Sequence, residues 1–177
     1  MAHPIISEGL ERIVVSLGDE AKKLSGATLL VSGGAGFLGS YVCGVIALLN
    51  ERVLPRPCRV IAVDNYITGS LRSFMGDLYD GHITFVRGDV SAPLHLDVSP
   101  DYVIHAAGLA SPVYYRQHPL ETIESAVYGA KNLLDFSRAQ SGAVRGFLFF
   151  SSSEIYGDPA PHAIPTPETY KGNVSSI

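Results

Sequence analysis

The chain has 177 residues, 46% of them hydrophobic, and carries a formal net charge of −4. This length fits a single domain with a sizeable core. The 13 lysines and arginines are scattered along the sequence, which argues against a surface for nucleic acid or anionic membranes. Apolar runs stay well short of the roughly 20 residues that a membrane-spanning helix needs. We therefore expect no nucleic-acid and no membrane partner.

The N-terminal sequence MAHPIISEGLERIVV has acidic residues and lacks a basic segment ahead of an apolar one, unlike a secretion signal. Cys43 and Cys58 are the only cysteines, and they lack the spacing of a metal site. We expect two buried, reduced thiols in a cytoplasmic protein, with no bound metal.

Apolar residues recur at three- and four-residue steps over residues 5–24, which predicts a helix with one apolar stripe. The stripe consists of Ile6, Leu10, Ile13, Val14, Leu17, Ala21 and Leu24. We interpret residues 1–26 as an N-terminal amphipathic helical extension, which packs on the outside of the domain or on a partner subunit.

From residue 27 onward, short apolar runs alternate with helix-like segments. Strands are expected at 27–33, 58–64, 82–89, 101–107 and 146–153, and helices at 36–51, near 70–79 and at 118–140. In the last helix, Ile123, Val127, Ala130, Leu134 and Phe136 lie roughly on one side. The strands are unbroken apolar runs, as burial on both faces requires. Strands separated by helices predict a parallel, doubly wound α/β sheet, followed after Tyr156 by a proline-rich loop.

The segment SGGAGFLGS (32–40) joins the first strand to the next helix and spaces three glycines three residues apart. Gly33 can permit a tight turn that a Cβ would forbid. Gly36 can let the backbone approach a phosphate at the helix N-terminus, where unpaired N–H groups and the helix dipole favour an anion. Gly39 can let the helix lie close to the strand. The spacing is G-x-x-G-x-x-G rather than the general G-x-G-x-x-G.

Asp64 ends the second predicted strand. At this position a carboxylate can accept hydrogen bonds from the ribose hydroxyls of an adenosine, and it repels a 2′-phosphate. The combination with the glycines predicts dinucleotide binding, with NAD favoured over NADP. The alternative is that Asp64 is only a turn or cap residue before Asn65.

Five motifs resemble those of the extended short-chain dehydrogenase/reductase family and occur in the same order: SGGAGFLGS (32–40), VDNYITGS (63–70), RGDV (87–90), HAAG (105–108) and SSSEIYGDP (151–159). This family includes nucleotide-sugar epimerases, dehydratases and decarboxylases. ASPVYYRQHP (110–119) and the ending PETYKGNVSSI are most similar to its UDP-glucuronate decarboxylase (UDP-xylose synthase) branch. The resemblance implies that residues 27–177 form a Rossmann-type NAD-binding domain.

The resemblance also implies contacts for each part of the cofactor and for the substrate. Gly33, Gly36, Phe37 and Leu38 would line the pyrophosphate; Asp64, Asn65, Thr68, Gly69 and Ser70 the adenosine ribose; Asp89 and Val90 the adenine; Ala106, Ala107 and Gly108 the floor beside the nicotinamide; Ser111 and Tyr115 the sugar and its phosphates. A packing role is the alternative for Tyr115.

Two catalytic residues follow from the same resemblance. Ser152 matches the hydroxyl residue of the family's Ser/Thr–Tyr–Lys set and would hydrogen-bond the sugar C4 hydroxyl. Glu154 matches an acid that dehydratases and decarboxylases keep, and it would assist a later acid–base step. Ser153 stands where dehydratases carry an aspartate, which counts against plain dehydration. Alternatively, Ser152 satisfies backbone groups at the strand end and Glu154 begins a helix.

Two features depart from the family pattern. Ala126 stands in place of the asparagine expected three residues before Gly129. No tyrosine is followed by a lysine four residues later, although the family uses that pair as base and activating cation. The resemblance implies that this pair and a small substrate lobe would follow Ile177, so we expect a truncated Rossmann domain without turnover.

The leading hypothesis is NAD-dependent modification of a nucleotide sugar, with decarboxylation of UDP-glucuronate to UDP-xylose through a 4-keto sugar as the reaction. A 4-epimerase of NDP-sugars and a non-catalytic NAD-binding module are the alternatives. The expected partner is a UDP-linked sugar. The family's homodimers imply that the helix at 117–140 could join a helix bundle between subunits of a longer protein.

Overall fold

The computed structural model describes residues 3–68, 81–140, 142 and 144–174. Within these residues, five parallel strands form one sheet in the order β3–β2–β1–β4–β5. The strands are β1 (Thr28–Ser32), β2 (Arg59–Asp64), β3 (Ile83–Arg87), β4 (Tyr102–His105) and β5 (Gly146–Phe149). The strand order reverses between β1 and β4, and open α/β sheets bind ligands outside the carboxyl ends of the strands at such a point. The predicted doubly wound fold is confirmed.

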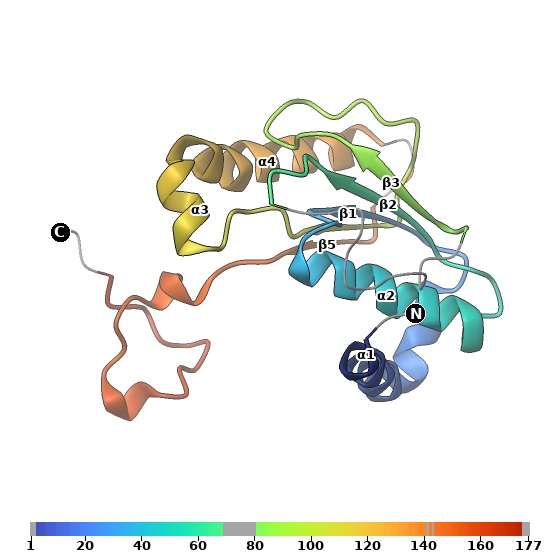
Figure 1. The fold of residues 1–177 in the computed structure, drawn as a ribbon, viewed down its shortest axis with the longest axis horizontal. Helices are drawn as coiled ribbons and strands as arrows, with labels where there is room; N and C mark the ends of the chain where they lie inside the picture. The colour runs from blue at the N-terminus through green and yellow to red at the C-terminus, as the bar shows by residue number, and fades with distance from the viewer. Residues whose placement is uncertain (1–2, 69–80, 141, 143, 175–177) are drawn as a thin grey trace.

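Helices cover both faces of the sheet (Figure 1). One face carries α1 (Pro4–Leu17) and α2 (Phe37–Arg52), and the other carries α3 (Pro112–Gln117) and α4 (Pro119–Ala139). Side chains alternate along β1, so Val31 packs in the core beneath α2, whereas Leu30 packs with Leu133 of α4. Three short 3₁₀ helices complete the described secondary structure: η1 (Gly18–Leu24), η3 (Ser153–Tyr156) and η4 (Pro161–Ala163).

The helix expected over residues 5–24 is two elements. Gly18, at φ +51°, caps α1, and the chain continues as the 3₁₀ helix η1. Glycine adopts a positive φ without the steric cost that a Cβ would bring, which permits the chain to leave the helix here. Leu10 is 1% exposed and belongs to the same core as α2. The extension therefore packs on its own chain.

Three other expectations differ from the structure. Burial on both faces was expected of every strand, but β5 is an edge strand of the described sheet, and Leu148 and Phe149 are 50% and 45% exposed. The short helix α3 was not expected. On α4, most of the predicted apolar side faces outward: Ile123, Val127 and Leu134 are exposed, whereas the buried residues of this helix are Gly129 and Leu133. The helix expected near 70–79 lies outside the described residues.

Both cysteines are buried and unpaired. Burial raises the pKa of the Cys43 and Cys58 thiols to about 12, so both stay protonated. Among the helices that the structure describes, none combines the length and the apolar character needed to cross a membrane.

Candidate nucleotide-binding site

A cleft lies at the carboxyl ends of β1, β2 and β4 and holds about 640 Å³ of empty space, part of it open to solvent. Its walls come from the loops after four strands and from one side of α4. The lining residues are Gly33, Gly36, Val63, Asp64, Asn65, Ile67, Thr68, Gly88, Asp89, Val90, Ser91, Ala106, Ala107, Gly108, Leu109, Glu121, Glu124 and Ser125.

The glycine turn after β1 forms one wall, and its geometry tolerates few side chains. Gly33 has φ +71°, and a Cβ there would lie 2.6 Å from the Ala106 carbonyl oxygen. A Cβ on Gly39 would lie 2.0 Å from the Gly33 carbonyl oxygen, so this glycine lets α2 approach the turn rather than the strand. Gly34, between them in the chain, also has no room for a side chain, because a Cβ there would lie 2.5 Å from the Ala62 Cβ.

Gly36 differs from these glycines because its missing side chain leaves open space. It is the N-cap of α2, and among the described residues beyond its chain neighbours a Cβ there would meet only the Gly33 carbonyl oxygen within 4 Å, at 3.2 Å. The first turn of an α-helix presents backbone N–H groups without intrahelical acceptors, and the helix dipole adds positive potential. The rim of the cleft at Gly36 is therefore suited to an anionic group.

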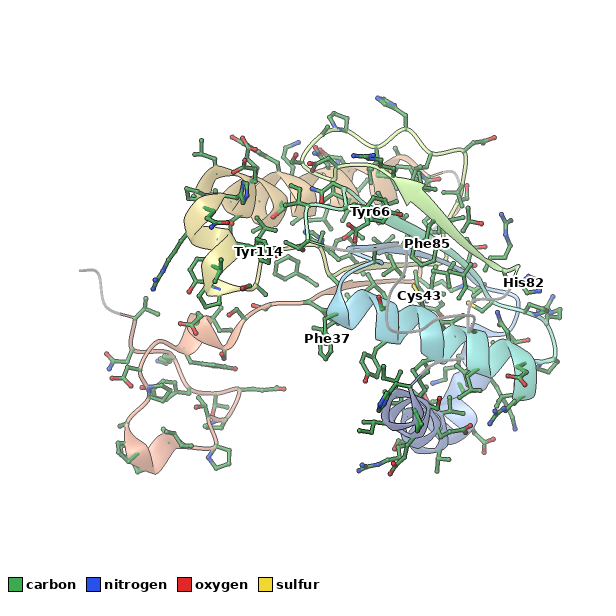
Figure 2. All side chains as sticks on the ribbon, in the orientation of Figure 1. Phe37, Cys43, Tyr66, His82, Phe85 and Tyr114 are labelled. Carbon is green, nitrogen blue, oxygen red and sulfur yellow. The ribbon has the colours of Figure 1, made fainter. Side chains whose placement is uncertain are left out.

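Phe37 and Leu38 were predicted to line the pyrophosphate, but neither side chain lines the cleft. Phe37 is 68% exposed and packs edge-on against Tyr41, with ring centroids 5.5 Å apart. Figure 2 shows Phe37 at the start of α2, pointing away from the sheet. Leu38 lines an apolar groove on the α2 face instead. Any contact of these residues with a bound phosphate must come from the backbone.

Asp64 is 8% exposed and connects the glycine turn to the end of β2. Its Oδ2 accepts a hydrogen bond from the Ala35 amide at 3.0 Å, and its Oδ1 accepts one from the Tyr66 amide at 2.8 Å. Asp64 therefore does stabilise a turn, as the alternative interpretation of this residue predicted. A carboxylate has about four lone-pair positions, so Asp64 can still accept hydrogen bonds from a ligand in the cleft that it lines.

A hydrogen-bonded group forms the wall after β3. Asn65 Nδ2 donates to Asp89 Oδ2 at 3.1 Å, and the other Asp89 oxygen accepts from the amide and the hydroxyl of Ser91. Partial burial acts to raise the pKa of Asp89, but these hydrogen bonds outweigh it and lower the pKa below its ordinary value. Asn132 of α4 holds this loop by donating to the Val90 carbonyl oxygen at 2.9 Å.

Most of the predicted cofactor residues meet in this cleft. Those that line it are Gly33, Gly36, Asp64, Asn65, Thr68, Asp89, Val90, Ala106, Ala107 and Gly108. Gly69 and Ser70 lie outside the described residues. One wall was not predicted from the sequence: it is the side of α4 that carries Glu121, Glu124 and Ser125, with the buried His105 behind it. Two glutamates three residues apart on a predicted helix were a signal, but they did not indicate which way that side faces.

Among the described residues that line the cleft are the carboxylates of Asp64, Asp89, Glu121 and Glu124, and none of these described residues is a lysine or arginine. Such walls favour hydrogen-bond donors, such as hydroxyl and amino groups, and disfavour a further phosphate away from the helix N-terminus. Among the residues that the structure describes, no cluster of histidines, cysteines and carboxylates is suited to hold a metal ion.

The predicted catalytic and substrate residues do not line the cleft. Ser152 is the N-cap of η3, and its hydroxyl accepts a hydrogen bond from the Glu154 amide at 3.2 Å. Both side chains are exposed on the segment that leaves the sheet after β5 (Figure 1). Ser111 is the N-cap of α3, and Tyr115 on that helix is 39% exposed. Their catalytic and substrate roles stay predictions.

A switch-point cleft with a glycine turn and an acidic residue after β2 is typical of the dinucleotide-binding α/β class. Comparison of sequences makes this specific: the NAD dependent epimerase/dehydratase family matches residues 29–175, and the chain belongs to this family. The resemblance stated from the motifs is confirmed.

Individual relatives agree with the family. UDP-glucuronic acid decarboxylase 2 of Arabidopsis thaliana is 39% identical over 155 residues, which are 88% of this chain and 32% of that protein. UDP-glucose 4-epimerase of Thermus thermophilus, solved with NAD, has a TM-score of 0.58 and 26% identity over 83% of this chain and 44% of that one. The Thermotoga maritima enzyme, solved with UDP-glucose, has a TM-score of 0.56 and 26% identity over 75% and 40% of the two chains. The chain spans between 30% and 41% of the length of the curated relatives it matches.

Proposed function

We propose that residues 27–177 bind NAD and serve a nucleotide-sugar enzyme, most specifically a decarboxylase of UDP-glucuronate. The observation that carries the cofactor assignment is the glycine turn. At Gly33 and Gly39, neighbouring backbone atoms lie too close to admit a side chain. At Gly36, the missing side chain leaves space at the start of α2. This cradle, which side chains would fill, fits a pyrophosphate.

The remaining cleft residues fit the other parts of the dinucleotide. Asp64 and Asn65 would receive the adenosine ribose, because both present polar atoms at the end of β2. Asp89 and Val90 would flank the adenine, and residues 106–108 would form the floor beside the nicotinamide. The carboxylates disfavour an additional 2′-phosphate, so NAD should bind in preference to NADP.

NAD, when bound, supplies a hydride acceptor and donor. In the proposed reaction, C4 of the sugar would lose a hydride and its hydroxyl a proton, which gives a 4-keto sugar. The C5 carboxylate would then leave as CO₂ and C5 would take up a proton. Finally, a hydride would return to C4 and a proton to its oxygen. Ser152 would hydrogen-bond the C4 hydroxyl and Glu154 would assist proton transfer. Sequence identity of 39% to a UDP-glucuronic acid decarboxylase, over 88% of this chain, supports this reaction.

We consider two alternatives. The solved UDP-glucose 4-epimerases that share the fold favour a 4-epimerase. The other alternative is an NAD-binding module without catalysis; within these 177 residues no tyrosine is followed by a lysine four residues later. We expect this chain alone not to turn over any sugar nucleotide, because the proton-transfer base is missing.

The test has two steps. Isothermal titration of the 177-residue chain should show NAD binding at least tenfold tighter than NADP, and equal or absent binding would contradict the cofactor assignment. A form of the protein as long as its relatives, given UDP-glucuronate, should then release CO₂. Epimerised sugar without CO₂ would support the epimerase instead. Steady turnover by the 177-residue chain, free of longer forms, would contradict the expected inactivity.

A further inference from the structure

His105, at the end of β4, is a buried titratable residue to which the proposed function assigns no role. The side chain is 1% exposed. Its Nδ1 lies 2.7 Å from the Ser32 hydroxyl of β1, and its Nε2 lies 3.2 Å from the Ser125 carbonyl oxygen of α4. Phe149 of β5 packs edge-on against the ring, with centroids 5.3 Å apart.

The partners determine which ring nitrogen carries the proton. The Ser125 carbonyl oxygen can only accept, so Nε2 must donate to it. Nδ1 is then an acceptor, and the Ser32 hydroxyl donates to it. Burial lowers the pKa of His105, against the smaller opposing effect of the Ser125 carbonyl. The ring is therefore neutral near pH 7, as the Nε2–H tautomer.

The two hydrogen bonds of His105 form a bridge from Ser32 to Ser125, and the three residues belong to or adjoin three walls of the cleft. Ser32 immediately precedes Gly33, His105 immediately precedes Ala106, and Ser125 lines the cleft itself. The parallel ladder already joins β1 to β4, since the Ala106 amide donates to the Ser32 carbonyl oxygen at 3.0 Å. What the imidazole adds is a polar link from this pair of strands to α4.

The approach of α4 to this ring depends on a glycine. A Cβ on Gly129 would lie 3.2 Å from His105 Nε2 and 2.9 Å from Val90 Cγ2. Gly129 is one turn beyond Ser125 on the same helix. The helix thus lies close to both the imidazole and the loop that carries Asp89, and a small displacement of α4 would change the width of the cleft.

We propose that His105 is a positioning residue for the dinucleotide: its neutral ring, by bridging Ser32 and Ser125, holds the α4 wall at a set distance from the glycine turn and the floor. The proposal rests on the proposed NAD site. A link of this kind acts on cofactor affinity because a preformed site need not reorder its walls on binding.

The first test compares NAD affinities of folded variants by isothermal titration. His105→Phe keeps an aromatic ring but loses both hydrogen bonds, so NAD should bind at least tenfold more weakly. His105→Gln should recover part of the loss, because its amide can donate to the Ser125 carbonyl. Val103→Ala is the matched control: it truncates a buried side chain of the same strand and core, and should lower the melting temperature while leaving NAD affinity within twofold.

Unchanged affinity in a folded His105→Phe variant would overturn the proposal, as would an equal weakening in Val103→Ala, which would indicate general destabilisation. The second test needs no variant. Nitrogen-15 NMR of the cofactor-free protein at pH 7 should show the neutral Nε2–H tautomer at His105, and an Nδ1–H tautomer or a charged ring would overturn the bridge. Wild-type protein that shows this tautomer but binds no NAD would contradict the proposed function rather than the bridge.

Discussion

Gly36→Val tests the phosphate cradle directly, because the fold itself does not need a glycine there. The residue has φ −76° and ψ 177°, which are angles that any residue adopts. A Cβ would meet the Gly33 carbonyl oxygen at 3.2 Å, which requires a shift of a few tenths of an ångström. Replacing an N-cap glycine by an apolar residue costs about 1 kcal/mol of stability. The variant should therefore fold.

Its effect on NAD should be much larger. The valine side chain would occupy the space beside the first turn of α2 and keep a phosphate from the backbone N–H groups. A hydrogen bond to a charged group contributes about 1.5–3 kcal/mol, so losing two would cost about 3–6 kcal/mol. At about 1.4 kcal/mol for each factor of ten, the affinity should fall by about a hundredfold to ten-thousandfold.

The assay is isothermal titration with NAD, alongside thermal unfolding followed by circular dichroism. Gly81→Val is the matched control, because it makes the same substitution at an exposed turn before β3, where a Cβ would meet no atom of the described residues within 4 Å. This control should bind NAD as the wild type does. A folded Gly36→Val variant whose dissociation constant stays within twofold of the wild-type value would refute the cradle.

Three further predictions concern the cleft, the N-terminal helix and pH. Asp64→Asn removes the charge but keeps an oxygen that can accept from one neighbouring amide, so the ratio of NADP to NAD affinity should rise; an unchanged ratio in titrations with both would count against its role. Leu10→Ala should lower the free energy of unfolding in urea by about 2–5 kcal/mol, whereas a change below 1 kcal/mol would show that α1 does not pack as described. Because burial lowers the pKa of folded His105, the unfolded chain binds this proton more readily. Stability should therefore be lost as pH falls below about 6.5, and equal slopes of stability against pH in wild type and His105→Gln would contradict this.

The strands of the sheet could be predicted well because each one is marked by a short run of apolar residues. Buried parallel strands need apolar side chains on both faces, and the five expected segments contain the five observed strands. The rule did not predict burial at β5, the edge strand of the described sheet, where Leu148 and Phe149 are 50% and 45% exposed despite an apolar sequence. The short helix α3 has no buried residue, so it left no apolar pattern to detect. The end of α1 could have been predicted from the glycine at position 18, but the apolar stripe continues past this glycine into η1 and so indicated one longer helix.

The parts of the site that depend on neighbours in the chain could be predicted from the amino-acid order. The glycine turn, its strand and helix, and Asp64 after the next strand follow from local backbone needs and from the parallel order of the strands. Two other parts depend on how distant segments pack. The position of α4 against the sheet makes Glu121, Glu124 and Ser125 a wall of the cleft, and the pairing of β1 with β4 brings His105 to Ser32, 73 residues away in the chain. A helix pattern specifies which residues share a side, but the packing of that helix on the sheet decides what each side faces.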